Sequence, residues 1–194
     1  MHAYEERARY DDILGDVAAV ERAHKLGFAH SIRRYLYAPD PLAAGETALD
    51  VGCGQGHGAL VLAHKGYTVT GVDRCAPTPE VAAQDRVTIE CAHVGTWEPT
   101  QRFDLVCLCD FLEHLQNPEG MLARVVKWAK PSGLLFTTIP IEGSESPNPW
   151  HVQAWTIHQV RAMLNERWQI LAEMACAPEH ELYAICRPKA VAHA

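Results

Sequence analysis

The chain has 194 residues, of which 48% are hydrophobic and 21% are charged. This length suits one domain, because chains usually divide only beyond roughly 250 residues, so two full catalytic domains are excluded. The composition is that of a globular protein and excludes disorder as the main state. A formal net charge of -7 gives no general attraction to nucleic-acid phosphates or anionic lipids. A nucleic-acid partner would therefore need a local basic patch.

The sequence also lacks the usual marks of export. No apolar run approaches the roughly 20 residues needed to cross a bilayer, and the start, Met1 to Arg7, is too polar for a signal peptide. The seven cysteines include no C-x-x-C pair, and most lie in apolar stretches such as Leu105 to Cys109. Buried, reduced thiols are therefore favoured over a disulfide framework or a zinc site. We expect a cytoplasmic protein with no membrane segment.

The N-terminal segment has its own pattern. Residues 4 to about 38 carry apolar side chains at helical spacing, which predicts one or two helices before the first strand. Pro39 and Pro41 end this segment, because proline removes a backbone donor and disfavours helix in the residue before it. We therefore expect a helical N-terminal cap segment over residues 1–44 and a core over residues 45–194, within a single domain overall.

In the core, β-prone runs alternate with stretches long enough for helices, which predicts a parallel sheet with helices on both faces. Only residues 176–180 separate the last two strands; this is too short for a crossover helix and predicts an antiparallel hairpin. The expected fold is α/β and Rossmann-like, with a seven-stranded, mainly parallel sheet. Strands are expected at residues 47–51, 68–72, 87–91, 105–109, 134–139, 168–175 and 181–187, and the main helices at 58–65, 119–130 and 156–165.

The most informative segment is the glycine loop from Gly52 to Gly58, after the first predicted strand. Closely spaced glycines between a buried strand and a helix let the backbone approach a ligand and point helix N-terminal amides at it. The second strand ends at Asp73, about 20 residues further on, where a carboxylate can accept both hydroxyls of a ribose. Gly56 comes one residue earlier than in a dinucleotide fingerprint. Asp50, at the end of the strand, would repel a pyrophosphate and favour a cationic ligand.

The run Leu49-Asp50-Val51-Gly52-Cys53-Gly54-Gln55-Gly56 resembles motif I of class I S-adenosylmethionine-dependent methyltransferases. Asp73 matches their acidic residue at the end of strand two, and the resemblance covers roughly residues 45 to 187. It implies S-adenosylmethionine as cofactor, with the loop near its methionine part, Asp50 near the amino group through the loop or a water, and Asp73 on the ribose. The implied cofactor-binding residues are Asp50, Gly52, Cys53, Gly54, Gly56, Asp73, Arg74, Val94 and Cys109.

The adenine end of the implied cofactor site departs from the family pattern. Many relatives carry an acidic residue after strand three that binds the adenine amino group, and this chain has none there. We therefore expect backbone groups near His93 and Val94 to bind the adenine, or packing alone to hold it.

A second group of polar residues follows the fourth predicted strand, at the same edge of the sheet. If Asp110 opens a helical turn, Glu113 and His114 project on its side three and four positions later. His151, in the loop after the fifth strand, is expected to fold over the site. These four side chains are a possible divalent-metal site that would lower the pKa of an acceptor oxygen. Alternatively, His114 or His151 acts as a general base, or Glu113 and His114 are structural.

This second group resembles two kinds of methyltransferase. Ubiquinone-pathway O-methyltransferases share the sequence around Leu112-Glu113-His114, and some of them bind a divalent cation with an acidic pair and the histidine. Small-RNA 2′-O-methyltransferases combine an acid-x-x-Glu-His run with a later histidine followed by Trp-Thr, as His151 and Trp155-Thr156 do here. Both usually carry Glu where this chain has Asp110.

The resemblance implies a methyltransferase that moves a methyl group from S-adenosylmethionine to an oxygen, or less readily a nitrogen, of a small molecule. A metal-dependent RNA 2′-O-methyltransferase is the first alternative, and the negative charge argues against it. A non-catalytic, cofactor-binding partner subunit is the second. The N-terminal helices and the loop from Glu142 to His151 are expected to select the acceptor. Core packing is expected for most nearby aromatic residues, with an aromatic lid as the alternative: Tyr10, Tyr35, Tyr37 and Trp150.

Overall fold

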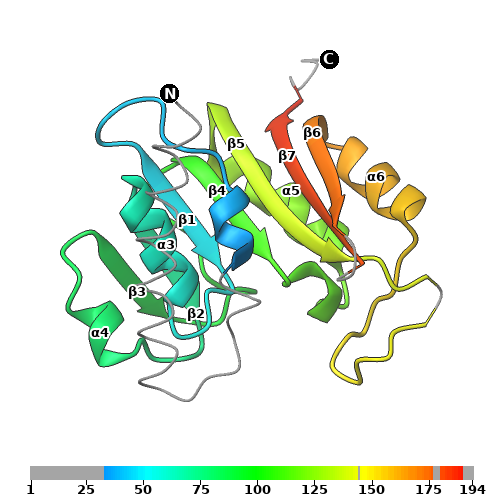
Figure 1. Ribbon diagram of the computed structural model, residues 1–194, viewed down its shortest axis with the longest axis horizontal. Coiled ribbons are helices and arrows are strands. Elements are labelled where there is room, and N and C mark those ends of the chain that lie inside the picture. The colour runs from blue at the N-terminus through cyan, green and yellow to red at the C-terminus, as the bar shows by residue number, and fades with distance from the viewer. Residues whose placement is uncertain (1–32, 144, 177–179, 190–194) are drawn as a thin grey trace.

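The computed structural model describes residues 33–143, 145–176 and 180–189 (Figure 1). Within these ranges one seven-stranded sheet has the order β3-β2-β1-β4-β5-β7-β6. Strands β1 to β5 pair in parallel, and β7 runs antiparallel to both of its neighbours. The predicted Rossmann-like α/β fold with an antiparallel C-terminal hairpin is confirmed. The strands are β1 (Thr47–Val51), β2 (Thr68–Asp73), β3 (Val87–Cys91), β4 (Phe103–Cys109), β5 (Ala129–Pro140), β6 (Trp168–Cys176) and β7 (Glu181–Pro188).

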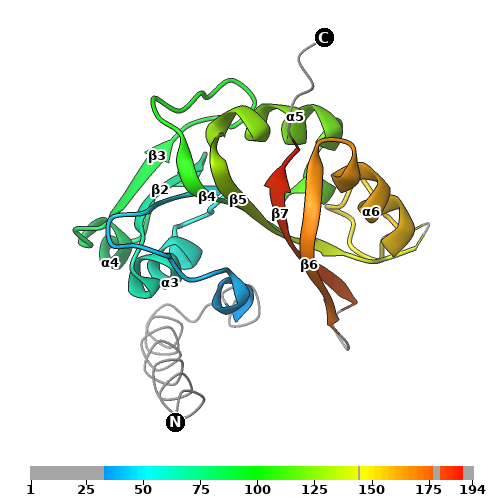
Figure 2. The same cartoon turned by 90° about the horizontal axis from the view of Figure 1, so that it is seen from above.

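Helices cover both faces of the sheet, as predicted (Figure 2). On one face, α3 (His57–Lys65) and α4 (Pro79–Ala82) pack together with the 3-10 turn η1 (Arg34–Tyr37). On the other face lie α5 (Pro118–Trp128) and α6 (Ile157–Asn165). The short 3-10 turn η2 (Leu112–His114) follows β4 at the carboxyl edge.

Strand β4 shows why its sequence is apolar without alternation. Val106 and Leu108 belong to the apolar cluster under α5 and α6, whereas Leu105 and Cys107 belong to the cluster under α3. Successive side chains of a strand point to opposite faces, so a strand covered on both sides needs apolar residues at every position. The carboxyl end of β4 is thereby fixed in the middle of the sheet, next to β1.

Several boundaries differ from the prediction: β4 begins at Phe103 and β5 at Ala129, earlier than the predicted residues 105 and 134. The predicted helix over residues 119–130 ends at Trp128, because Ala129 already pairs with Phe103 and belongs to β5. The start of α6, by contrast, follows from a capping box that the sequence carries. The Thr156 hydroxyl accepts a hydrogen bond from the Gln159 amide, and the Gln159 side chain accepts one from the Thr156 amide.

The cysteines and aromatic residues depart in part from the expectation of burial. Cys53, Cys107, Cys109 and Cys186 are buried, whereas Cys75, which follows β2, and Cys91, the last residue of β3, are exposed. Core packing is right for Tyr35 and wrong for Tyr37 and Trp150, whose exposed fractions are 53% and 78%.

Most of the predicted N-terminal helical segment, including Tyr10, lies outside the described residues. The described part contains η1, which ends at Tyr37 with Ala38 as its C-cap, immediately before Pro39. The Tyr35 ring lies so close to α3 that a Cβ at Gly58 would come within 2.3 Å of it, so only glycine fits there. The division into residues 1–44 and 45–194 stays a prediction. Of the helices described, none has the length and apolar character to span a bilayer.

Candidate active site

A cavity of about 410 Å³ opens at the carboxyl ends of the parallel strands, beside the glycine loop. In open α/β sheets this edge is where ligands bind. Its lining combines Gly52, Cys53 and Gly54 of the loop with Cys109 and Asp110 at the end of β4 and Arg34 of η1. The cavity therefore lies between three segments that are distant in the sequence.

The glycine loop needs glycine for two different reasons. Gly52, Gly54 and Gly56 all have a left-handed backbone, with φ of 73°, 56° and 91°. A Cβ at Gly52 would come within 2.3 Å of the Phe111 ring, and one at Gly56 within 2.7 Å of Val81. At Gly54, in contrast, a Cβ would meet no atom within 4 Å. Because Gly54 also lines the cavity, this is the point where backbone is open to a ligand.

Asp73 is held directly beside that loop. Its Oδ2 accepts a hydrogen bond from the Gly54 amide at 3.0 Å, and its Oδ1 accepts one from the Cys75 amide at 2.9 Å. These bonds orient the carboxylate at the end of β2, where the resemblance implies a ribose.

Asp50, at the end of β1, is fully buried and only half satisfied. Its Oδ1 accepts a hydrogen bond from the Tyr35 hydroxyl at 2.8 Å, and its Oδ2 has no hydrogen-bond partner among the described residues. Burial raises the pKa of Asp50 to about 7; the Tyr35 bond opposes this rise and the charge of Asp73 adds to it. An amino group next to Oδ2, directly or through a water, would satisfy that oxygen. The residues present therefore fit the amino-acid end of S-adenosylmethionine.

Some of the expected cofactor-binding residues line the cavity and others do not. Gly52, Cys53, Gly54 and Cys109 line the cavity, and Asp50, Asp73 and Gly56 lie behind its lining. Arg74 and Val94 are not part of the lining, and the Val94 carbonyl already accepts a hydrogen bond from Arg124 at 3.1 Å.

Cys75, Arg34 and Tyr35 also line the cavity but were not among the expected binding residues. Cys75 directly follows the Asp73-Arg74 pair, a signal that was available in the sequence. Tyr35 was expected only as a core residue or part of an aromatic lid, and no sequence signal marked Arg34.

Asp110 does not open a helical turn, contrary to expectation. It has a left-handed backbone with φ of 47°, and its amide donates to the carbonyl and hydroxyl oxygens of Thr138, both at 3.2 Å. The 3-10 turn starts two residues later. The Asp110 carboxylate forms an ion pair with Arg34, and the Arg34 Nε donates to Glu181 at 2.9 Å. Burial raises the pKa of Asp110 to about 6, and the charge of Arg34 opposes that rise.

Glu113 is buried, and its Oε1 lies 4.0 Å from His114 Nε2. Its exposed fraction is 0%, and neither carboxyl oxygen has a hydrogen-bond partner among the described residues. Burial, followed by the charge of Asp110, raises the pKa of Glu113 to about 8. Its backbone carbonyl accepts hydrogen bonds from the amides of Val152 and Gln153 at 2.9 and 3.1 Å, which attaches the loop after β5 to η2.

The two histidines differ in how many of their ring nitrogens have a hydrogen-bond partner. His114 Nδ1 lies 3.0 Å from the Trp150 carbonyl, an acceptor, so Nδ1 carries the proton and Nε2 can accept one. His151 Nδ1 lies 2.9 Å from the Glu142 carboxylate, and its Nε2 lies 2.8 Å from Asn148 Nδ2. Asn148 Oδ1 accepts from the Trp150 amide, which leaves Nδ2 as a donor to His151. Both ring nitrogens of His151 are thus engaged.

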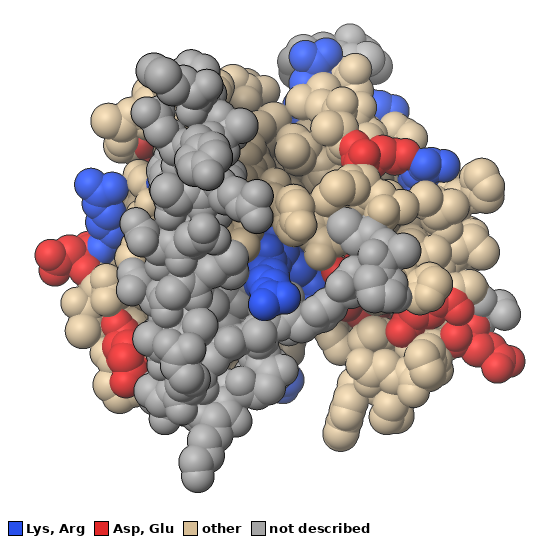
Figure 3. Space-filling view, viewed as in Figure 1, with Lys and Arg blue, Asp and Glu red and all other residues tan. Residues whose placement is uncertain are grey.

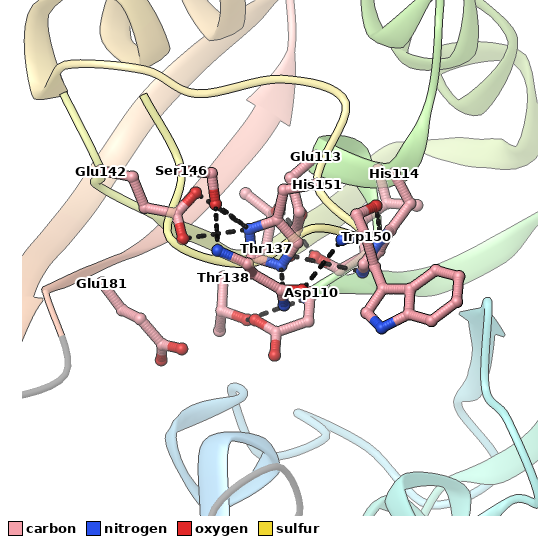
Figure 4. Close-up of polar contacts among 12 residues, drawn as sticks. Asp110, Glu113, His114, Thr137, Thr138, Glu142, Ser146, Trp150, His151 and Glu181 are labelled. Carbon is pink, nitrogen blue, oxygen red and sulfur yellow. Dashed lines mark hydrogen bonds and ion pairs between the residues drawn. The ribbon is translucent and has the colours of Figure 1, made fainter. Parts of the chain in front are cut away.

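Three of the four expected metal ligands come together. Glu113, His114 and His151 each offer one ligand atom, and these atoms lie within 4.8 Å of one another (Figure 4). Asp110 stands outside this group because Arg34 holds its carboxylate. His114 Nε2 lies 4.0 Å from Glu113 Oε1, which is longer than the roughly 3.4 Å between two ligands of a tetrahedral ion with bonds of about 2.1 Å. Because both ring nitrogens of His151 are engaged, a metal ion would also require His151 to release either Glu142 or Asn148.

The strand order, the glycine loop and the acids at the ends of β1 and β2 define a class I S-adenosylmethionine-dependent methyltransferase fold. The chain belongs to the methyltransferase domain family, whose model matches residues 21–187.

Named relatives agree with this assignment. The chain is 29% identical over 140 residues to the ubiquinone biosynthesis O-methyltransferase of Coxiella burnetii, covering 68% of this chain and 60% of that protein. It is 33% identical over 102 residues to the enzyme of the same name from Pseudomonas fluorescens, covering 48% of this chain and 44% of that protein. The chain thus spans less than two thirds of these relatives.

Solved structures share the fold. The 1,6-didemethyltoxoflavin-N1-methyltransferase of Burkholderia thailandensis, crystallised with bound 1,6-didemethyltoxoflavin and S-adenosylhomocysteine, superposes with a TM-score of 0.71. The match covers 97% of this chain and 90% of that one at 21% identity.

Proposed function

We propose that the protein transfers the methyl group of S-adenosylmethionine to an oxygen of a small-molecule acceptor. The observation that carries the proposal is the buried Asp50 carboxylate, half satisfied, beside a left-handed glycine loop and Asp73. Family membership supports methyl transfer, and the O-methyltransferase relatives favour oxygen. Nitrogen is the second acceptor atom, favoured by the N-methyltransferase of the same fold.

The bound cofactor would supply a methyl group activated by its sulfonium. The protein's part is to place the acceptor in line with that methyl group and to remove a proton from the attacking oxygen. His114 is the candidate base, because its Nδ1 donates to the Trp150 carbonyl, and its Nε2, 4.0 Å from Glu113 Oε1, makes no hydrogen bond among the described residues. His151 lies against it, with ring centroids 4.9 Å apart and planes at 79°. Since Glu142 and Asn148 engage both nitrogens of His151, we assign it to positioning the His114 ring.

A divalent cation is the second way to activate the acceptor. Glu113, His114 and His151 would hold it, and the two unpartnered oxygens of the buried Glu113 favour such a role. Carboxylate and imidazole ligands suit a catalytic divalent ion, which would lower the pKa of a bound hydroxyl. A methyl-transfer assay after chelation, with metal added back, separates the two: activity and melting temperature untouched by chelation would exclude the metal.

The structure weakens the RNA alternative. The resemblance to small-RNA 2′-O-methyltransferases depends on His151 followed by Trp155-Thr156. In the structure Trp155 is buried in the core and Thr156 caps α6. Both residues therefore have a structural role without RNA. On the face shown in Figure 3, basic and acidic side chains are scattered and form no broad basic surface among the coloured residues. A small acceptor is therefore favoured over RNA. We also propose that the protein is cytoplasmic, because free, mostly buried cysteines suit a reducing compartment.

The experiment that tests the proposal is a labelled methyl-transfer assay over a panel of hydroxylated and aminated small molecules, with RNA as a further substrate. We expect label on an oxygen of a small molecule. Label on RNA alone would contradict the proposal. Cofactor binding that survives alanine at His114 and His151, with the function of a protein complex retained, would identify a non-catalytic partner subunit instead.

A further inference from the structure

Two adjacent side chains of the turn η1 contact two groups at the carboxyl edge of the sheet: the buried acid of the glycine-loop region and the polar residues that follow β4. Arg34 and Tyr35 are each 6% exposed, although they lie outside the sheet and its main helices. Tyr35 reaches the end of β1 through its bond to Asp50. Arg34 reaches the end of β4 through Asp110 and the start of β7 through Glu181. One turn therefore joins three strand ends around the cavity.

Tyr35 is the group that favours the ionised form of Asp50. The titratable groups that face Asp50 are Tyr35 of η1, Asp73 of β2 and the thiols of Cys53, Cys107 and Cys109. Carboxyl and thiol neighbours become negative when they ionise, so they disfavour a charge on Asp50. The Tyr35 hydroxyl donates to Oδ1 and stabilises the carboxylate form. The same bond orients Oδ2, the oxygen that has no partner among the described residues.

Arg34 fixes the position of the turn. Its Nε donates to one oxygen of Glu181 at 2.9 Å, and the other guanidinium nitrogens pair with the second oxygen of Glu181 and with Asp110. A planar guanidinium can hold two carboxylates at fixed angles, which an ammonium cannot. Burial opposes the charge on Arg34, but the bond to Glu181 and the charge of Asp110 raise its pKa overall. Arg34 therefore stays charged and keeps η1 attached.

We propose that η1 is a positioning clamp for cofactor binding: Tyr35 presents the Asp50 carboxylate to the amino group of the cofactor, and Arg34 anchors the clamp on Asp110 and Glu181. This proposal rests on the proposed function, because it takes S-adenosylmethionine as the ligand. It assigns Tyr35 and Arg34 as positioning residues for the reaction.

The direct test is Tyr35→Phe, with S-adenosylhomocysteine as the probe in isothermal titration. The variant keeps the ring against Gly58 and removes only the hydroxyl. We expect the affinity to fall roughly tenfold, the size of one hydrogen bond to a charged group. Tyr37→Phe is the matched control: it lies on the same turn, is 53% exposed and should bind like the wild type.

The pH profile separates positioning from mere stability. In the wild type the affinity for S-adenosylhomocysteine should rise with pH through about 7, as Asp50 ionises. Without the Tyr35 bond the pKa of Asp50 rises further, so the midpoint of the profile should move to higher pH. A folded Tyr35→Phe protein with unchanged affinity and an unchanged profile would overturn the clamp.

Two further results complete the test. Arg34→Lys should also weaken binding, and less than additively with Tyr35→Phe, because the two side chains hold one turn. If Tyr35→Phe fails to fold, hydrogen exchange of wild-type residues 33–38 decides: the cofactor product should slow it, and no protection would overturn the proposal. A wild type that binds no S-adenosylhomocysteine at all would instead overturn the proposed function, which distinguishes the two failures.

Discussion

The two halves of the candidate active site are built differently. The half at the ends of β1 and β2 comes from one short stretch, residues 50–75, and is shaped by backbone: three left-handed glycines and a carboxylate that binds amides. The half at the ends of β4 and β5 is assembled from side chains of Glu113, Glu142 and His151, held by a loop. Backbone requirements leave a direct mark in the sequence, whereas the partner that a side chain selects does not.

The largest expected effect concerns the side-chain half. Replacing the proposed base, His114→Gln, should lower kcat by roughly 100-fold to 10,000-fold while the affinity for S-adenosylhomocysteine stays unchanged. His151→Gln should lower kcat less, because Glu142 and Asn148 already engage both of its nitrogens. Steady-state kinetics paired with titration would measure this. An equal or larger loss for His151→Gln would reverse the two roles.

The backbone half is tested by two glycines with opposite surroundings. Gly52→Ala should lower the free energy of unfolding by roughly 2–4 kcal/mol, because the new Cβ meets the Phe111 ring on a left-handed backbone. Gly54→Ala should cost only the backbone strain of roughly 1–2 kcal/mol, since its Cβ enters open space. Because that space is the cavity, Gly54→Ala should nevertheless weaken cofactor binding. Urea unfolding and titration of both variants would show whether the loop acts on stability and binding separately.

The last prediction concerns the pH dependence of stability that the buried acid of the side-chain half produces. The pKa of Glu113 is raised from 4.5 to about 8 in the folded protein, so the folded state retains a proton that the unfolded state loses. Stability from this group is therefore complete below the unfolded pKa and is lost as pH rises through the folded one. Glu113→Gln should flatten the fall in unfolding free energy between pH 4.5 and 8. A bound divalent ion would give the opposite sign, because it stabilises the carboxylate.

The fold could be predicted because its signals are local. Strand β4 is apolar at every position from Leu105 to Cys109 since both of its faces are covered, and the short gap before β7 admits only a hairpin. The helix starting after Thr156 follows from a capping box within four residues. The glycine loop and Asp73 were predictable for the same reason.

For the side-chain half, the sequence named candidate residues but did not predict their backbone conformation or their contacts. The left-handed backbone of Asp110 depends on its bonds to Thr138 of the neighbouring strand, which no spacing within 110–114 reveals. The role of Arg34 leaves no signal in the sequence, because its partners lie 76 and 147 residues away. Trp155 matched a functional pattern and is a core residue instead. Each of these outcomes is decided by long-range contacts.

The measurement that tests the central claim most directly is the shift in melting temperature on adding S-adenosylhomocysteine, in the wild type and in Asp73→Ala. The carboxylate of Asp73 lies on the amide of Gly54, the open point of the loop. We predict a rise in the wild type, since a ligand that binds only the folded state stabilises it, and no rise in Asp73→Ala. A rise with NAD in place of S-adenosylhomocysteine would contradict the account.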